Sequence, residues 1–183
     1  NGTYVTDDTV YVIPGNSGSL VRTGYTFVGW NTLANGTGTD YPAGVGATYS
    51  APADLALFAK WQANTYSISY NGNGATGGTA PGNDTYVTGA VNPYTVSTNS
   101  GTLTKTGFTF DNWYTTSTGS GGTAYTAGTG TLTTTSDLIL YAKWSAASYT
   151  VSYASGDNAV SAPSQSTNAY GSSFTLPNAL TRT

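Results

Sequence analysis

The sequence contains no cysteine, histidine, methionine or glutamate, and only 7% of its 183 residues are charged. Without cysteine and histidine the chain lacks the usual ligands of zinc, and without histidine and glutamate it lacks the commonest general acids and bases. Its eight acidic residues are all aspartates and face five lysines and arginines, for a net charge of −3. Because phosphate binding depends on clustered cations, we expect no nucleic-acid partner. The composition therefore predicts a protein that is not an enzyme and has no cofactor.

Long apolar runs are missing as well, and none approaches the roughly 18 residues that a membrane-spanning helix needs. This predicts no membrane insertion. What the chain does contain is 15 tyrosines, 5 phenylalanines, 4 tryptophans and many valines and threonines. Aromatic and β-branched side chains pack well on pleated sheets, so we expect a folded, mainly β protein with little helix.

The strongest feature of the sequence is internal repetition. Three blocks recur 83 residues further along the chain, in the same order. Such self-similarity at a fixed period is typical of repeat architectures. The blocks at residues 22–30, 54–61 and 66–70 recur at 105–113, 137–144 and 149–153.

These matches divide the chain into three small β-rich units. Residues 1–62 are predicted to form a partial unit without its first strand, 63–145 a complete unit, and 146–183 the first half of a third. Two explanations remain open. Either an array of repeats is cut within a repeat, or the ends of neighbouring chains complete each other.

Within the blocks, apolar residues alternate with polar ones. Tyr66, Ile68 and Tyr70 fall on one face of an extended segment, which is typical of a half-buried strand. Residues 138–141 are apolar on both faces and predict a central strand covered on both sides. No long amphipathic helix pattern is present.

Large aromatic residues recur at equivalent positions and are expected to form the core of each unit. An alternative is a sugar-stacking platform that includes Trp30, Trp113, Tyr114 and Tyr125, which would make the chain a carbohydrate-binding module. The predicted core aromatics are Tyr25, Phe27, Trp30, Trp61, Phe108, Phe110, Trp113 and Trp144.

Lys60 and Lys143 occupy equivalent places immediately before a tryptophan. We favour the interpretation that their stems cover the tryptophan rings. The alternative is an isopeptide cross-link from such a lysine to Asn or Asp, for which a neighbouring aspartate would have to replace the missing glutamate.

Calcium is weakly suggested by two pairs of oxygen-bearing side chains. These are Asp7 with Asp8 and Asp157 with Asn158, and neither pair has EF-hand spacing. We therefore predict no metal site.

Residues 66–74, 105–114 and 136–144 together resemble the Listeria-Bacteroides repeat, and the resemblance extends over nearly the whole chain. That family occurs in tandem on bacterial surface proteins, including internalin-type adhesins. The resemblance implies a β-grasp-like fold, in which a small sheet embraces a short helix, and an extracellular structural or adhesive role on the cell surface. It implies no catalytic residues. A host protein or glycan is the alternative partner.

The partial units at the two ends are complementary, which suggests a head-to-tail contact between identical chains or neighbouring repeats. A strand from the third unit would complete the first unit of the next chain, and such a contact builds a filament because it does not close. The candidate strand-exchange segment contains Tyr149, Val151, Tyr153, Phe174 and Leu176.

Overall fold

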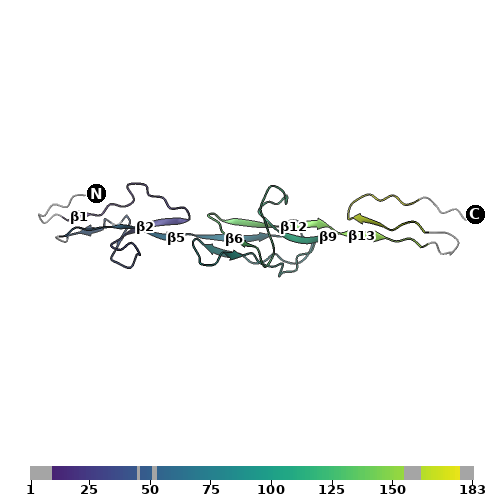
Figure 1. Cartoon of the computed structure of the whole chain (residues 1–183), viewed down its shortest axis with the longest axis horizontal. Helices are drawn as coiled ribbons and strands as arrows, with labels where there is room; N and C mark the ends of the chain where they lie inside the picture. The colour runs from purple at the N-terminus through teal and green to yellow at the C-terminus, as the bar shows by residue number, and fades with distance from the viewer. Residues whose placement is uncertain (1–9, 45, 51–52, 155–161, 178–183) are drawn as a thin grey trace, which may run out of the picture. The chain divides into compact units, whose positions relative to one another are not determined.

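The computed structural model describes residues 10–44, 46–50, 53–154 and 162–177, and within these ranges it consists of strands, turns and loops (Figure 1). This confirms the mainly β prediction. The short helix that a β-grasp fold requires is not found among the described residues.

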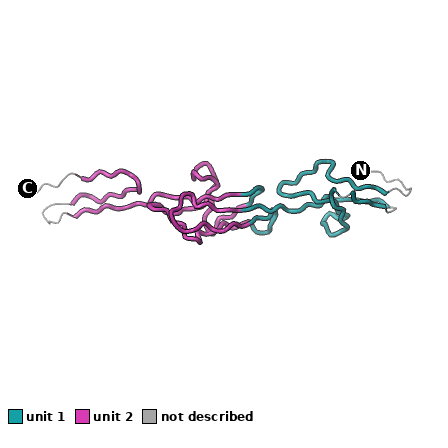
Figure 2. The backbone as a smooth tube through the Cα atoms, turned by 180° about the vertical axis from the view of Figure 1, so that it is seen from behind, with its two compact units in different colours: residues 1–67, 85–92, 133–137 teal, residues 68–84, 93–132, 138–183 magenta. Residues whose placement is uncertain are grey.

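The chain forms two compact units, each assembled from segments that are separate in the sequence (Figure 2). Unit 1 comprises residues 1–67, 85–92 and 133–137. Unit 2 comprises residues 68–84, 93–132 and 138–183.

The first copy of the repeat forms a three-stranded antiparallel sheet in the order β3-β2-β5. Its strands are β2 (Tyr25–Asn31), β3 (Asp40–Pro42) and β5 (Phe58–Ala63). A β-bulge interrupts the pairing of β2 with β5 after Phe27. A second, two-stranded sheet pairs β1 (Tyr11–Val12) with β4 (Thr48–Tyr49).

The second copy repeats this pairing with β9 (Phe108–Tyr114), β10 (Ala124–Tyr125) and β12 (Leu138–Ala146). β9 pairs with β12 as β2 pairs with β5, and both partners are displaced by 83 residues: Tyr25 faces Ala63, and Phe108 faces Ala146. The small sheet also recurs, as β8 (Tyr94–Thr95) with β11 (Thr131–Leu132).

The second copy has two strands that the first lacks among the described residues. β6 (Thr65–Asn71) runs parallel to β12 and gives a five-stranded sheet in the order β10-β9-β12-β6-β7, in which β7 spans Asp84–Val87. β12 is therefore central, as the sequence predicts. The expectation that both its faces are covered is wrong, because Leu140 is fully buried whereas Ile139 is 48% exposed.

A final hairpin pairs β13 (Ser148–Val151) with β14 (Ser166–Ala169). β13 begins the third copy of the repeat and corresponds in sequence to β6. Most of the fully buried side chains of the described residues belong to the second copy. Those largest in volume are Trp113, Ile68, Leu140, Val96 and Asn31.

Candidate functional site

The core aromatics of the first copy form one cluster on the β2–β5 sheet. Phe27 meets the rings of Trp30 and Trp61 edge-on, at centroid distances of 5.3 and 5.7 Å. Edge-to-face pairs of this kind are favourable because the positive ring edge meets the negative ring face. The Trp30 indole also donates a hydrogen bond to the carbonyl of Pro14 at 2.7 Å.

The second copy builds the same cluster from Phe110, Trp113 and Trp144, with centroid distances of 5.1 and 5.8 Å. Here the Trp113 indole donates to the carbonyl of Ser97, the equivalent of Pro14, at 2.9 Å. Trp113 is fully buried, so it cannot stack on a sugar.

The outermost members of the predicted aromatic core lie beside basic side chains. The Arg22 guanidinium lies 3.8 Å from the ring centre of Tyr25, and the Lys105 ammonium lies 5.0 Å from that of Phe108. Both rings are half-buried, and each belongs to the first residue of its strand.

The residue between consecutive repeats is held by backbone hydrogen bonds on both sides. At the first junction, Asn64 N donates to Gly24 O, and Asn64 O accepts from Thr88 N. At the second, Ala147 makes the same two bonds, with Gly107 and Tyr170.

The glycine of the Thr-Gly-aromatic block is required at both junctions. Gly24 and Gly107 both have a φ of +78°, a conformation that favours glycine. A Cβ on Gly24 would lie 2.6 Å from the Thr88 methyl group, and one on Gly107 would overlap the ring of Tyr170. Each junction therefore depends on a close approach that a side chain would block.

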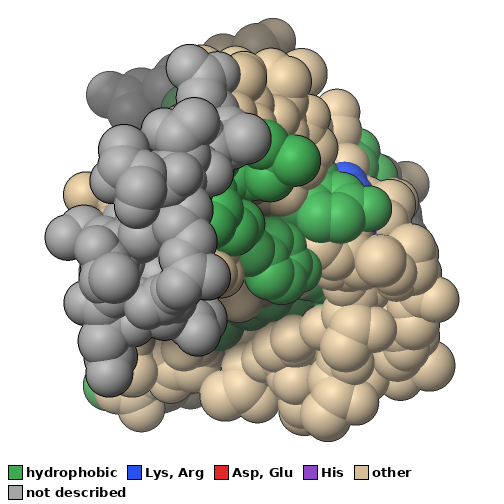
Figure 3. Space-filling view, turned by 90° about the vertical axis from the view of Figure 1, so that its right-hand side faces the viewer, with side chains coloured by type: hydrophobic (Ala, Val, Ile, Leu, Met, Phe, Trp, Pro, Cys, Tyr) green, Lys and Arg blue, Asp and Glu red, His purple; other side chains and the backbone are tan. Residues whose placement is uncertain are grey.

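The predicted strand-exchange segment lies partly on the surface. Val151 and Tyr153 are half-buried, whereas Tyr149 and Leu176 are 53% and 70% exposed. Phe174 is also exposed. The side of the molecule seen in Figure 3 carries a group of hydrophobic side chains. The edge of β13 away from β14 pairs with no strand of the described residues.

A polar cluster that sequence reasoning missed lies at one end of the β2–β5 sheet. Asn31 is only 1% exposed, and its amide nitrogen donates to an Asp40 carboxylate oxygen at 2.6 Å. The other Asp40 oxygen accepts from the Lys60 ammonium at 2.5 Å. Hydrogen bonds from Lys60 and Asn31 hold the pKa of Asp40 below its ordinary value, so this carboxyl group is charged near neutral pH.

The equivalent lysine of the second copy has different surroundings. Lys143 donates to the carbonyl of Gly119 at 3.1 Å and lies over the ring of Tyr114 at 5.4 Å. Tyr114 and Ala124 stand opposite each other, as Asn31 and Asp40 do in the first copy. The two equivalent lysines therefore differ in their hydrogen-bond partners: Lys60 bonds to a carboxylate and Lys143 to a backbone carbonyl.

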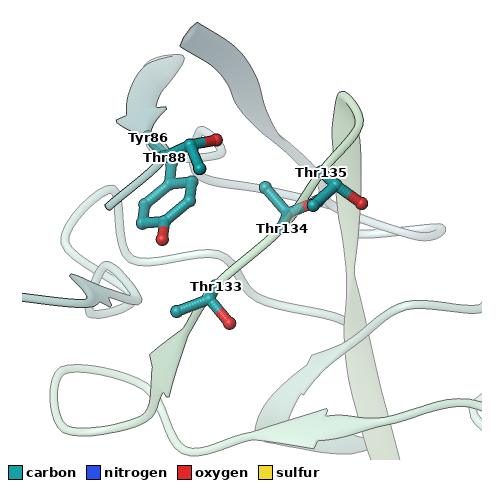
Figure 4. Close-up of a pocket in the computed structure, with 5 residues that line it drawn as sticks. All are labelled: Tyr86, Thr88, Thr133, Thr134 and Thr135. Carbon is teal, nitrogen blue, oxygen red and sulfur yellow. The ribbon is translucent and has the colours of Figure 1, made fainter. Parts of the chain in front are cut away.

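Five hydroxyl-bearing residues line an open pocket of about 330 Å³ (Figure 4). Tyr86 and Thr88 come from β7 and the residue that follows it, and residues 133–135 from the segment before β12. None of the five lining residues is charged.

The candidate calcium ligands Asp7, Asp8, Asp157 and Asn158 lie outside the described residues. Within the described ranges, no three acidic side chains come together as metal ligands. No helix within these ranges has the length and apolar character to cross a bilayer.

The strand register, the aromatic clusters and the junctions all recur 83 residues further along the chain. The protein is therefore a tandem β-repeat protein. The chain belongs to the Listeria-Bacteroides repeat domain family, whose model matches residues 1–60 and 66–143.

A curated relative from Evansella cellulosilytica, called a putative Gly-rich membrane protein, is 34% identical over 172 residues. The match covers 91% of this chain but 19% of the relative, so the chain spans about a fifth of that protein. No solved structure matches the chain.

Proposed function

We propose that this chain is part of an extracellular stalk on a bacterial surface, in which tandem repeats act as spacers. The family and the relative named as a membrane protein support a surface-associated role. The observation that carries the stalk proposal is the junction between repeats. β5 and β6 are separated by Asn64 alone, and β12 and β13 by Ala147 alone.

These junctions favour stiffness over flexibility. A Gly/Ser-rich linker behaves as a random coil, whereas each junction residue here has its N–H and its C=O bonded to neighbouring loops. Extending a stalk requires that successive repeats keep a fixed relation, because a flexible link shortens the mean end-to-end distance.

The stiffness can be tested by inserting a flexible Gly-Ser linker after Asn64. The control carries the same insertion in the exposed loop at residues 117–122. Small-angle X-ray scattering should show a broader distance distribution for the Asn64 variant and an unchanged one for the loop variant. If the parent chain is already as broad as the Asn64 variant, the stalk proposal is wrong.

Surface location has its own test. Antibodies against the purified chain should label intact cells of the source bacterium as strongly as lysed ones. Labelling that requires lysis would contradict an extracellular location.

Assembly into a filament is a second candidate, favoured by two unpaired strand edges. Within the described residues, β5 lies at the edge of its sheet, and β13 has one free edge. β5 corresponds in sequence to β12, and β13 to β6, which pair in parallel in the second copy. The same pairing between chains would be a strand addition.

Light scattering over a range of protein concentrations, with electron micrographs of the same samples, tests the filament. Long polymers should form and should disappear on deletion of residues 149–183. Val91→Lys is a control because Val91 is 98% exposed and belongs to neither edge strand. A monomer at every concentration would exclude the filament and leave the stalk proposal intact.

A further inference from the structure

The side-chain amide of Asn31 is held in a single orientation by its hydrogen bonds. Its oxygen accepts from the backbone N–H groups of Leu33 and Gly38, at 2.8 and 3.0 Å. Its nitrogen donates to the Gly38 carbonyl at 3.1 Å and to Asp40. Exchanging oxygen and nitrogen would set donors against donors, so this assignment is the one that satisfies the network.

The two backbone N–H groups polarise the amide carbonyl. An oxygen that gains negative charge during attack on the carbonyl carbon would be stabilised by the same two donors, as in an oxyanion hole. The absence of a side chain at Gly38 makes this possible, because a Cβ there would lie 2.9 Å from the amide oxygen of Asn31. The site is thus arranged for nucleophilic attack on Asn31.

A nucleophile lies on the same face of the sheet. Asn31 stands opposite Phe58 in the β2–β5 ladder, and Lys60 stands opposite Gly29, which places Asn31 and Lys60 on a diagonal. Diagonal neighbours lie about 7–8 Å apart at the backbone, within reach of a long side chain. Asp40 connects the two, because one of its oxygens bonds to Lys60 and the other to Asn31.

We propose that Lys60 and Asn31 react to form an intramolecular isopeptide bond between β5 and β2, with Asp40 as the catalytic acid and base. This inference goes beyond the stalk proposal and does not depend on it. The bond would join the last strand of the first copy to the strand at its centre.

The reaction balances without an oxidant or a cofactor. Asp40 takes a proton from the Lys60 ammonium, and the neutral amine attacks the carbonyl carbon of Asn31, forming a C–N bond and a negatively charged oxygen. The attacking nitrogen loses a second proton, and the departing nitrogen receives protons through Asp40. The original C–N bond then breaks. The products are one new amide and one ammonium ion, formed from one ammonium group and one amide.

Partial exposure sets the expected rate. The side chains of Lys60 and Asp40 are 35% and 49% exposed, so water competes for the hydrogen bonds that hold the two groups together. We therefore expect the bond to form slowly after folding, and the mass of the protein should be followed over time.

The experiment is intact mass spectrometry of the purified full chain. The parent chain should lose the mass of one ammonia molecule. Lys60→Arg should keep its full mass, because a guanidinium carries a permanent charge and is not a nucleophile. Asp40→Asn should also keep its full mass, and Lys143→Arg should lose ammonia as the parent does.

Peptide mapping distinguishes the cross-link from other losses of ammonia. Succinimide formation at Asn35-Gly36 would give the same mass change, but it leaves Lys60 cleavable by trypsin. A single tryptic peptide of residues 23–105, lighter by one ammonia and with Asn31 joined to Lys60, supports the proposal. Full mass in the parent at all times, or an ammonia loss in the parent with Lys60 still cleavable by trypsin, would overturn it. Tryptophan fluorescence verifies that each variant is folded.

Discussion

The first and second copies of the repeat place the same segments in the same sheet register, yet only the second buries its central tryptophan completely. β6 accounts for the difference. It brings the Tyr70 ring edge-on against Trp113, at a centroid distance of 4.7 Å, and the residue that follows it, Gly72, accepts a hydrogen bond from the Trp144 indole at 3.0 Å. The central tryptophan of the cluster is therefore half-buried without this parallel strand and fully buried with it.

The second copy has a fully buried tryptophan, whereas the first has a cluster of hydrogen-bonded polar side chains. Asn31 and Asp40 replace Tyr114 and Ala124 at the same register positions. A shared backbone thus carries the proposed cross-link in one copy and an aromatic contact with Lys143 in the other. Two sequence differences at equivalent positions of the sheet therefore determine which groups surround the lysine.

The largest effect is expected when each copy loses its central tryptophan. Trp113→Ala should lower the free energy of unfolding by about 3–5 kcal/mol, since a fully buried ring leaves a cavity. Trp30→Ala should cost less, because Trp30 is half-buried. Urea denaturation followed by circular dichroism measures both. Equal losses would mean that β6 adds no burial energy to the second copy.

The next effect isolates the parallel strand itself. Ile68→Ala should cost about 2–5 kcal/mol, because Ile68 is fully buried in β6. Val151 is its equivalent in β13 and is half-buried, so Val151→Ala should cost about 1 kcal/mol or less. The same denaturation experiment applies. A loss at Val151 as large as that at Ile68 would show that β13 already has a partner strand.

A smaller effect concerns the tyrosine pair that β6 brings to the second copy. The Tyr70 hydroxyl lies 3.0 Å from that of Tyr94 and accepts from Ser97 N at 2.8 Å. Tyr70→Phe should cost about 1 kcal/mol through these hydrogen bonds. Denaturation at neutral pH measures it, and an unchanged stability would show that water replaces both bonds.

The same pair gives a pH dependence. Burial and the Tyr70 hydrogen bond raise the pKa of Tyr94, so the folded state holds this proton more tightly than the unfolded state. Its contribution to stability is complete below about pH 10, the ordinary tyrosine pKa, and decreases as the pH rises above it. Ultraviolet titration should show late ionisation of Tyr94, and Tyr94→Phe should remove that step.

The repeat spacing, the strands and the central position of β12 could be predicted from sequence because alternation and self-similarity are local patterns. Recurrence at the Trp30 position predicts that Trp113 belongs to the core, although it does not indicate how differently the two tryptophans are buried. Exposure of Ile139 could not be read from residues 138–141, since an apolar side chain on a sheet face gives no sign of whether another layer covers it.

The cluster around Asp40 was missed for a different reason. Lys60 and Lys143 recur at equivalent positions and are therefore visible in the repeat pattern, whereas the residues that distinguish their surroundings do not recur. The pairing of β2 with β3 and β5 brings Asn31 and Asp40 close to Lys60. This register depends on how the strands pair in the sheet, so it cannot be read from the residues of one strand. The sequence feature that indicates the cluster is the difference between the two copies at the positions near the recurring lysine.

The smallest expected effect comes from transferring the cluster to the second copy, with Tyr114→Asn and Ala124→Asp in a Lys60→Arg background. Any isopeptide cross-link at this position would then come from Lys143. We expect only partial conversion, since the chain between residues 114 and 124 is one residue longer than that between 31 and 40, and this shifts the backbone donors around the new amide. Lys143 must also leave the Gly119 carbonyl.

Intact mass over time, with peptide mapping, measures the yield. Conversion as complete as in the first copy would show that the carboxylate and the lysine suffice and that the donors of Leu33 and Gly38 add little. No conversion at all would locate the reactivity in those donors.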